Sequence, residues 1–130
     1  MHTENGQILT DSPRLSQKAR DILTDGKNKL YYSAASLLEI GKLHTSTPAV
    51  LEFSAEEFHS CCQESGAYDL INITENDIFS TSHLTRKADT PPHSGMFGKL
   101  MLAQAINRNM HLMTHDFLLT GYEYERILYV

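Results

Sequence analysis

Short apolar strand patterns alternate with helical patterns along most of this chain, and the alternation strongly constrains its fold. The strand patterns fall at four places: Leu30–Tyr32, Asp69–Ile73, His111–Thr114 and Ile127–Val130. When helices separate successive strands, the strands pair in parallel and the helices cover both faces of the sheet. The sequence therefore predicts the α/β class, with a parallel central sheet inside an α/β/α sandwich.

Local capping and spacing signals predict the helices between these strands. The five expected helices run from Ser16 to Gly26, from Ser33 to between Gly41 and His44, from Ser54 to Gly66, from Thr74 toward Leu84, and from Phe97 to Asn109. The segment between the last two, 86–98, carries two prolines and two glycines and few apolar residues. A loop of that length is unusual in a compact domain, so it is either mobile or functional.

Composition bounds the size of the protein and its surroundings. With 130 residues, the chain is expected to form a single domain over residues 1–130, with residues 1–10 irregular. No apolar run approaches the roughly 20 residues of a membrane helix, and the start has neither a basic nor an apolar signal region. Cys61 and Cys62 are adjacent, which disfavours both a disulfide between them and a zinc knuckle. We expect a reducing cytoplasm and no membrane partner.

Four segments, in this order, resemble a known family: Asp11–Ser16, Ser33–Ile40, Phe97–Ala105 and Leu112–Asp116. Together they are similar to the PIN-domain ribonucleases, and within them to the VapC-like toxins of bacterial toxin–antitoxin pairs. The resemblance covers the chain from Asp11 onward. It implies carboxylates at the carboxyl ends of the strands that hold Mg²⁺ or Mn²⁺, with a metal-bound water that cuts RNA. It also implies an antitoxin partner, an RNA substrate and a possible homodimer.

The resemblance assigns Glu39 and Asp116 as catalytic residues and metal ligands. The family has a first strand ending in a metal-binding aspartate, but Met1–Thr3 stands at that point here, so the strand is expected to be missing or replaced. The family also has two aspartates at the positions of Gly95 and Gly98. Two carboxylates hold one Mg²⁺ weakly and make a poor two-metal clamp. The resemblance therefore implies weakened or lost activity.

A missing central strand leaves backbone groups unpaired unless another segment covers the gap. We expect Gln7–Leu9, or a partner chain, to cover it in part, and the domain to be marginally stable. A start codon assigned too far downstream would explain the same absence. Asp11, Asp89 and Glu4 are hypothesised to replace the missing carboxylates, because they lie in loops or near the start.

Several candidate residues also have a structural interpretation. Ser36 to Glu39 forms a capping-box pattern, and Asp116 is a possible N-cap for the segment that follows it. Thr114, at the carboxyl end of a strand, either assists a metal-bound water or reflects β-propensity alone. His93 either contacts a phosphate or is a solvated loop residue.

Basic and aromatic residues near the expected site leave similar alternatives. Arg86, Lys87 and Lys99 either attract an RNA backbone or form a solvated face, and the net charge of −5 argues against a broad basic surface. Tyr31 and Tyr32 either stack on bases or pack in the fold.

The sequence leaves two functional hypotheses. One is a Mg²⁺-dependent ribonuclease toxin, and the other is a catalytically inactive PIN-like module that binds an antitoxin or dimerises. The small number of carboxylates at the expected site favours the catalytically inactive module over the active ribonuclease.

Overall fold

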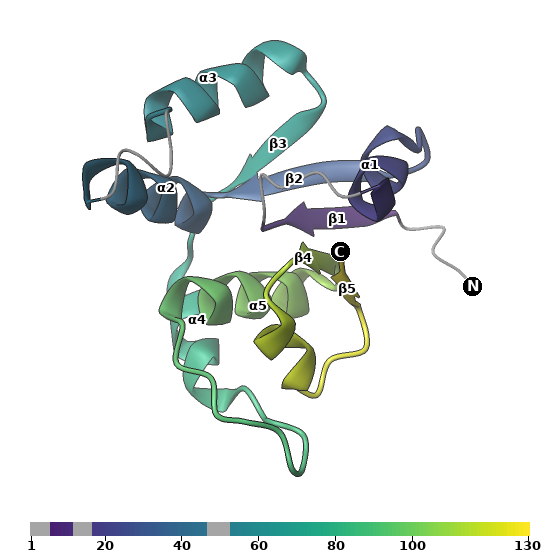
Figure 1. Ribbon diagram of the computed structural model, residues 1–130, viewed down its shortest axis with the longest axis vertical. Coiled ribbons are helices and arrows are strands. Elements are labelled where there is room, and N and C mark those ends of the chain that lie inside the picture. The colour runs from purple at the N-terminus through teal and green to yellow at the C-terminus, as the bar shows by residue number, and fades with distance from the viewer. Residues whose placement is uncertain (1–5, 12–16, 47–52) are drawn as a thin grey trace.

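A five-stranded, all-parallel sheet lies at the centre of the molecule, in the order β3-β2-β1-β4-β5 (Figure 1). The structure, a computed structural model, describes residues 6–11, 17–46 and 53–130. The strands are β1 (Gln7–Thr10), β2 (Lys29–Ser33), β3 (Tyr68–Ile71), β4 (His111–Thr114) and β5 (Ile127–Tyr129). Helices flank this sheet, so the predicted α/β class with a parallel central sheet is confirmed.

The five expected helices are present, and α3 and α4 begin with side-chain caps, whereas Ser16, the expected cap of the first helix, lies outside the described residues. They are α1 (Gln17–Thr24), α2 (Ala34–Ser46), α3 (Ala55–Ser65), α4 (Glu75–Ser80) and α5 (Met96–Arg108), with 3₁₀ turns η2 (Thr81–His83) and η3 (Phe117–Gly121). Ser54 and Glu57 form the expected capping box, and Gly66 ends α3 in the left-handed conformation at φ 67°. Within these described ranges, none of the helices has the length and apolar character needed to cross a membrane.

The central strand corrects one expectation. Residues 1–10 were expected to be irregular, and this is wrong for residues 7–10, which form β1. Ile8 pairs with Leu30 of β2 on one side and with His111 of β4 on the other. Leu9 is fully buried. A segment of the chain itself therefore occupies the middle of the described sheet, more completely than the partial cover expected of Gln7–Leu9.

Side chains that alternate along the strands build a core on each face of the sheet. Leu9 and Leu112 belong to a core with Met101 and Leu102 of α5. Ile8, Leu30 and Met113 face the other way and pack against Ala19 of α1. Tyr32 shares the face of Leu30 and contacts α3, where its ring meets Phe58 edge-on at 6.0 Å. The sheet is thus covered on both faces, as a parallel sheet requires.

Candidate functional site

The strand order reverses between β1 and β4. From β1 the chain builds the sheet outward through β2 and β3, and then crosses to the other side of β1 for β4 and β5. In open α/β sheets, ligands bind outside the carboxyl ends of the strands at such a reversal. Asp11 directly follows β1, and His115 and Asp116 directly follow β4. The arrow of β1 in Figure 1 points toward this edge and toward α2.

Thr114, the last residue of β4, connects the two aspartates. Its hydroxyl donates a hydrogen bond to Oδ2 of Asp11 at 2.5 Å. The hydroxyl oxygen of Thr114, Oγ1, also accepts a hydrogen bond from the backbone N–H of Asp116 at 3.0 Å. Thr114 is fully buried, and β-propensity alone does not account for these bonds. The hydroxyl therefore fixes Asp11 and Asp116 relative to each other.

Glu39 reaches the same edge from α2. The helix begins at Ala34, and the Oγ of Ser33 accepts a hydrogen bond from the N–H of Ala35 at 2.9 Å. Ser36 lies inside the helix, and its hydroxyl donates to Sδ of Met101 at 3.2 Å. Ser36 is not the N-cap, so the capping-box interpretation of Glu39 is wrong. Glu39 lies close enough to Asp11 and Asp116 for their charges to act on its carboxyl group.

The ionisation of Glu39 and of Asp11 depends on the carboxylates near them. Burial raises the pKa of Glu39, and the negative charges of Asp11 and Asp116 raise it further, against a smaller lowering by Lys42. Burial also raises the pKa of Asp11, while the hydrogen bond from Thr114 and the proximity of His115 lower it, and Asp116 raises it. Desolvation and like charge both disfavour the ionised forms. A cation at this edge would relieve both effects.

Asp116 already accepts two hydrogen bonds from the protein. Its Oδ1 accepts from the N–H of Leu118 at 3.0 Å, which makes it the N-cap of η3 and confirms that interpretation. Its Oδ2 lies 3.3 Å from Nε2 of His93. A carboxylate has about four lone-pair sites, so these bonds leave room for a further partner. Capping and metal binding by Asp116 are therefore compatible.

His93 is not a solvated loop residue, so that interpretation is wrong. Its side chain is 3% exposed. Gly95 and Gly98, where the resemblance expects aspartates, both lie beside the imidazole: a Cβ would lie 3.1 Å from Nε2 at Gly95 and 3.5 Å from Cε1 at Gly98. The glycines thus leave space that His93 occupies. Sequence reasoning missed the burial of His93, since its neighbours in the chain are polar or proline.

Two of the basic and aromatic candidates, Arg86 and Tyr32, have structural contacts. Arg86 donates to the carbonyls of Leu118 and Pro91, and its guanidinium lies 4.5 Å from the ring centroid of Tyr122. Lys87 is exposed. Tyr32 is fully buried and hydrogen bonds His59 at 2.8 Å, which confirms its packing interpretation.

Of the three proposed replacement carboxylates, Asp11 lies at the acidic edge. Asp89 is exposed in the 86–95 loop and has a φ of 63°. Asp89 does not appear among the charges that act on Asp11 or Glu39. Glu4 lies outside the described residues. We therefore take Asp11, Glu39 and Asp116, defined together as the acidic edge, as the candidate site.

The acidic edge has the donor chemistry for a hard divalent cation. Mg²⁺ and Mn²⁺ prefer carboxylate oxygens, and Mg²⁺ keeps several of its waters. Within the described ranges, no three His, Cys, Asp or Glu side chains already stand as a ready-made ligand group. A cation would have to draw the three carboxylates closer together.

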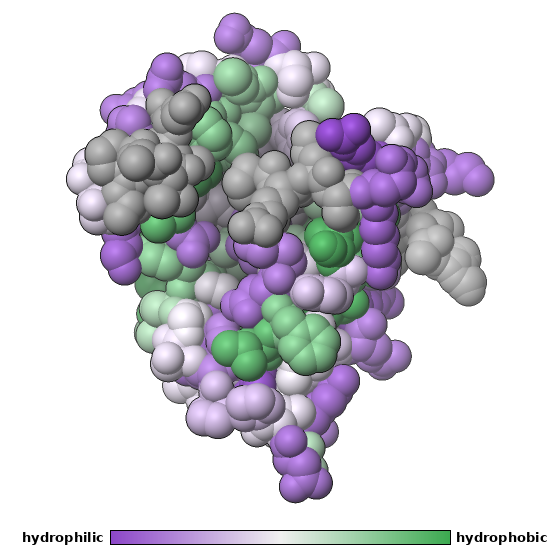
Figure 2. All heavy atoms as spheres, in the orientation of Figure 1, coloured by the Kyte–Doolittle hydropathy of each residue, from purple (hydrophilic) through white to green (hydrophobic). Residues whose placement is uncertain are grey.

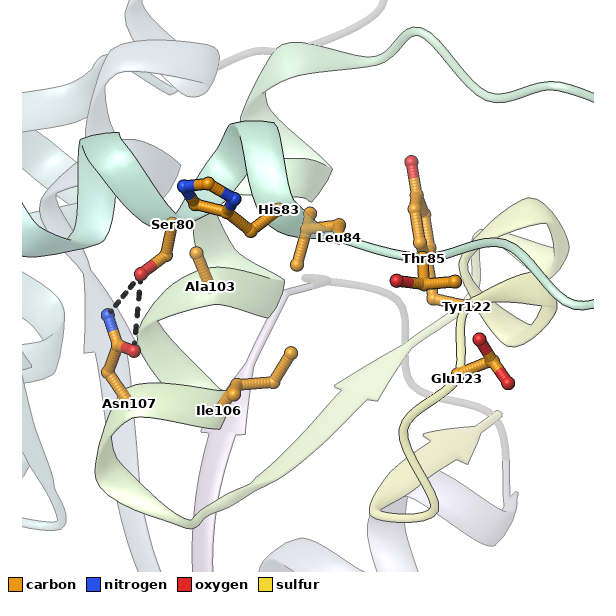
Figure 3. A pocket seen from close by; sticks show the side chains of 9 residues that line it. All are labelled: Ser80, His83, Leu84, Thr85, Ala103, Ile106, Asn107, Tyr122 and Glu123. Carbon is orange, nitrogen blue, oxygen red and sulfur yellow. Dashed lines mark hydrogen bonds between the residues drawn. The ribbon is translucent and has the colours of Figure 1, made fainter.

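A separate cavity of about 300 Å³ lies between α4, η2 and α5. In Figure 3, Ser80 and Asn107 lie at one end, joined by hydrogen bonds, and Tyr122 and Glu123 lie at the other. The acidic-edge carboxylates do not line this cavity. Tyr122 is shared between the two regions, because its hydroxyl bonds His93 at 2.9 Å.

No protein-family model matches this chain, and no curated protein matches it. The fold and the acidic edge are therefore the basis for assigning a function. One fold hosts many functions, so the function has to be inferred from the residues of the site.

Proposed function

We propose that this chain is a PIN-like domain of the VapC type, a cytoplasmic Mg²⁺- or Mn²⁺-dependent endoribonuclease with weakened activity. The observation that carries the proposal is the acidic edge: where the strand order reverses, Asp11 and Asp116 lie close enough to Glu39 for their charges to raise its pKa. The RNA phosphodiester backbone is the substrate. An antitoxin and a second copy of the chain are the proposed partners.

Each residue of the edge has a part in this chemistry. When bound, the metal supplies an activated water and neutralises charge on the phosphate. Asp11, Glu39 and Asp116 would hold it through their oxygens. Thr114 keeps Asp11 and Asp116 at fixed positions beyond the carboxyl ends of two adjacent strands. With Gly95 and Gly98 in place of two aspartates, the far side of the site lacks carboxylates, which accounts for weak activity.

A second candidate function is an inactive PIN-like module that binds an antitoxin or dimerises. It is favoured by large apolar side chains that remain exposed on several elements: Leu38 on α2, Ile78 and Phe79 on α4, Met96 on α5 and Phe117 on η3. Figure 2 shows green apolar patches among hydrophilic residues on the face in view. Such patches are typical of surfaces that contact other proteins.

A calorimetric Mn²⁺ titration separates these functions. The proteins to compare are the wild type and the variants Asp116→Asn, Asp11→Asn and Glu39→Gln, each of which removes one charge and keeps the shape. Asp89→Asn is the matched control, because Asp89 is an exposed loop carboxylate. We expect wild-type and control proteins to bind and the other three to bind weakly or not at all. Equal binding by all five would overturn the acidic edge as the site.

RNA cleavage tests the activity itself. A labelled single-stranded RNA is incubated with wild-type protein and Mn²⁺, with EDTA and with Asp116→Asn as controls. Cleavage that requires both Mn²⁺ and Asp116 supports the ribonuclease. Mn²⁺ binding without cleavage, or neither, supports the inactive module, and the mass of the protein in solution then reports whether it dimerises.

A further inference from the structure

The imidazole of His93 joins the 86–95 loop to the acidic edge. We propose that His93 is a positioning residue that holds the carboxylate of Asp116 in the orientation needed for a metal, and that Tyr122 in turn holds His93. The part of this inference that concerns metal binding rests on the proposed function. The part that concerns the orientation of Asp116 does not.

The hydrogen bonds define which nitrogen of His93 carries the proton. An ionised carboxylate only accepts hydrogen bonds, so Nε2, 3.3 Å from Oδ2 of Asp116, is the donor. In the neutral ring Nδ1 is then an acceptor, and it lies 2.9 Å from the hydroxyl of Tyr122. Tyr122 therefore donates to Nδ1 and selects the tautomer that points its N–H at Asp116.

Packing fixes the ring as well as the proton. The rings of His93 and Tyr122 meet edge-on, with centroids 5.5 Å apart and planes at 86°. The ring of Tyr122 is itself buried under the guanidinium of Arg86, which also donates to the carbonyl of Leu118. His93, Tyr122 and Arg86 thus tie the loop to η3, the turn that Asp116 caps.

The carboxylate of Asp116 needs such support. Its side chain is 40% exposed, so it would rotate freely without partners. The N–H of Leu118 holds Oδ1 and the imidazole of His93 holds Oδ2, and together they fix the plane of the carboxylate. Hydrogen bonds from surrounding groups orient metal ligands, and their loss typically costs 10–100-fold in metal affinity.

The first test compares Mn²⁺ affinity by calorimetry in wild type, His93→Ala, His93→Gln and Tyr122→Phe. We expect His93→Ala to weaken binding by about 10-fold or more. His93→Gln offers an amide N–H to Asp116 and should recover part of the affinity. Tyr122→Phe removes the hydroxyl and keeps the ring, so it should weaken binding less than His93→Ala. Wild-type affinity in a folded His93→Ala protein would overturn the proposal.

The second test needs no metal. Amide NMR spectra of the wild type and the same variants follow the N–H of Leu118, which bonds Oδ1 of Asp116. If His93 holds the carboxylate, His93→Ala shifts this resonance and speeds its hydrogen exchange, and His93→Gln partly reverses both. An unchanged Leu118 amide in His93→Ala would overturn the proposal. If the wild type binds no Mn²⁺, the proposed function fails and this measurement alone decides the role of His93.

Discussion

The hydroxyl of Thr114 donates a 2.5 Å hydrogen bond to the carboxylate of Asp11, a residue 103 positions earlier in the chain. It extends the pairing of two central strands by one step, because the N–H of Asp11 already donates to the carbonyl of Met113 at 2.8 Å. The acidic edge is therefore set by the register between β1 and β4. A slip of one residue would turn Asp11 away from it.

Replacing Thr114 with valine removes the hydroxyl and keeps the shape. Thr114→Val leaves a desolvated Asp11 oxygen and the N–H of Asp116 without their partner. We expect a loss of about 1–3 kcal/mol in the free energy of unfolding, measured in urea. Hydrogen exchange of the Asp116 amide should also accelerate. Thr114→Ser is the control: it keeps the hydroxyl, loses a methyl group worth about 1 kcal/mol, and should leave that amide protected. A protected amide in Thr114→Val would contradict this account.

The raised pKa values of Asp11 and Glu39 predict the pH dependence of stability. Their folded-state pKa values lie above the ordinary values of 3.8 and 4.5. Such groups contribute stability that is fully present below the ordinary pKa and is lost as the pH rises through the raised pKa. Without metal, Asp11→Asn and Glu39→Gln should therefore be more stable than wild type at neutral pH, and no more stable near pH 3. Urea unfolding in EDTA across this range measures the difference, with Asp89→Asn as control. Variants less stable than wild type at neutral pH would show that ionisation of Asp11 and Glu39 does not destabilise the folded protein.

The starts of α3 and α4 were predictable from the sequence because capping is local. Ser54 and Thr74 each sit within three residues of the acidic side chain that completes the capping box. The place of β1 was not predictable in this way. Gln7–Thr10 contains one apolar pair, Ile8 and Leu9, and its central position depends on pairing with residues of β2 and β4 far along the chain.

The residues of the candidate site differ in the same way: some could be predicted from local sequence, and others depend on contacts far along the chain. Glu39 and Asp116 were found through a resemblance in short segments, and Asp11 through charge and location alone. The burial of His93 was missed, because it depends on Tyr122, 29 residues away, and on the space left beside Gly95 and Gly98. Nothing in the polar, proline-containing sequence around His93 signals a buried side chain.

A buried ion pair between Asp77 and Arg108 fastens α4 to α5. The carboxylate of Asp77 is 1% exposed and accepts from both guanidinium nitrogens of Arg108, at 2.9 and 3.0 Å. Arg108→Gln leaves the buried carboxylate of Asp77 without its counter-ion. We therefore expect this variant to lose about 3–5 kcal/mol in the free energy of unfolding, measured in urea. Arg108→Lys keeps the charge without the two-pronged geometry and should cost less. These bonds hold the pKa of Asp77 well below 3.8, so the stability that the pair contributes is present at neutral pH and lost as the pH falls. Equal stability of Arg108→Gln and wild type at neutral pH would contradict this.

Gly98 offers a way to restore a carboxylate that the resemblance expects. It lies in the first turn of α5, where a negative charge is favoured, and a Cβ there would lie 3.3 Å from the methyl groups of Leu119 and 3.5 Å from His93. Gly98→Asp should therefore place a fourth carboxylate near Asp116 and beside the imidazole, with a small shift of the Leu119 methyl groups. We expect lower stability without metal and about tenfold tighter Mn²⁺ binding, since added ligand charge raises cation affinity. Gly98→Asn has nearly the same shape without the charge, so it separates crowding from electrostatics. If both variants bind Mn²⁺ equally, or neither binds more tightly than wild type, position 98 does not face the cation, and the glycine there gives no support to the proposal of weakened activity.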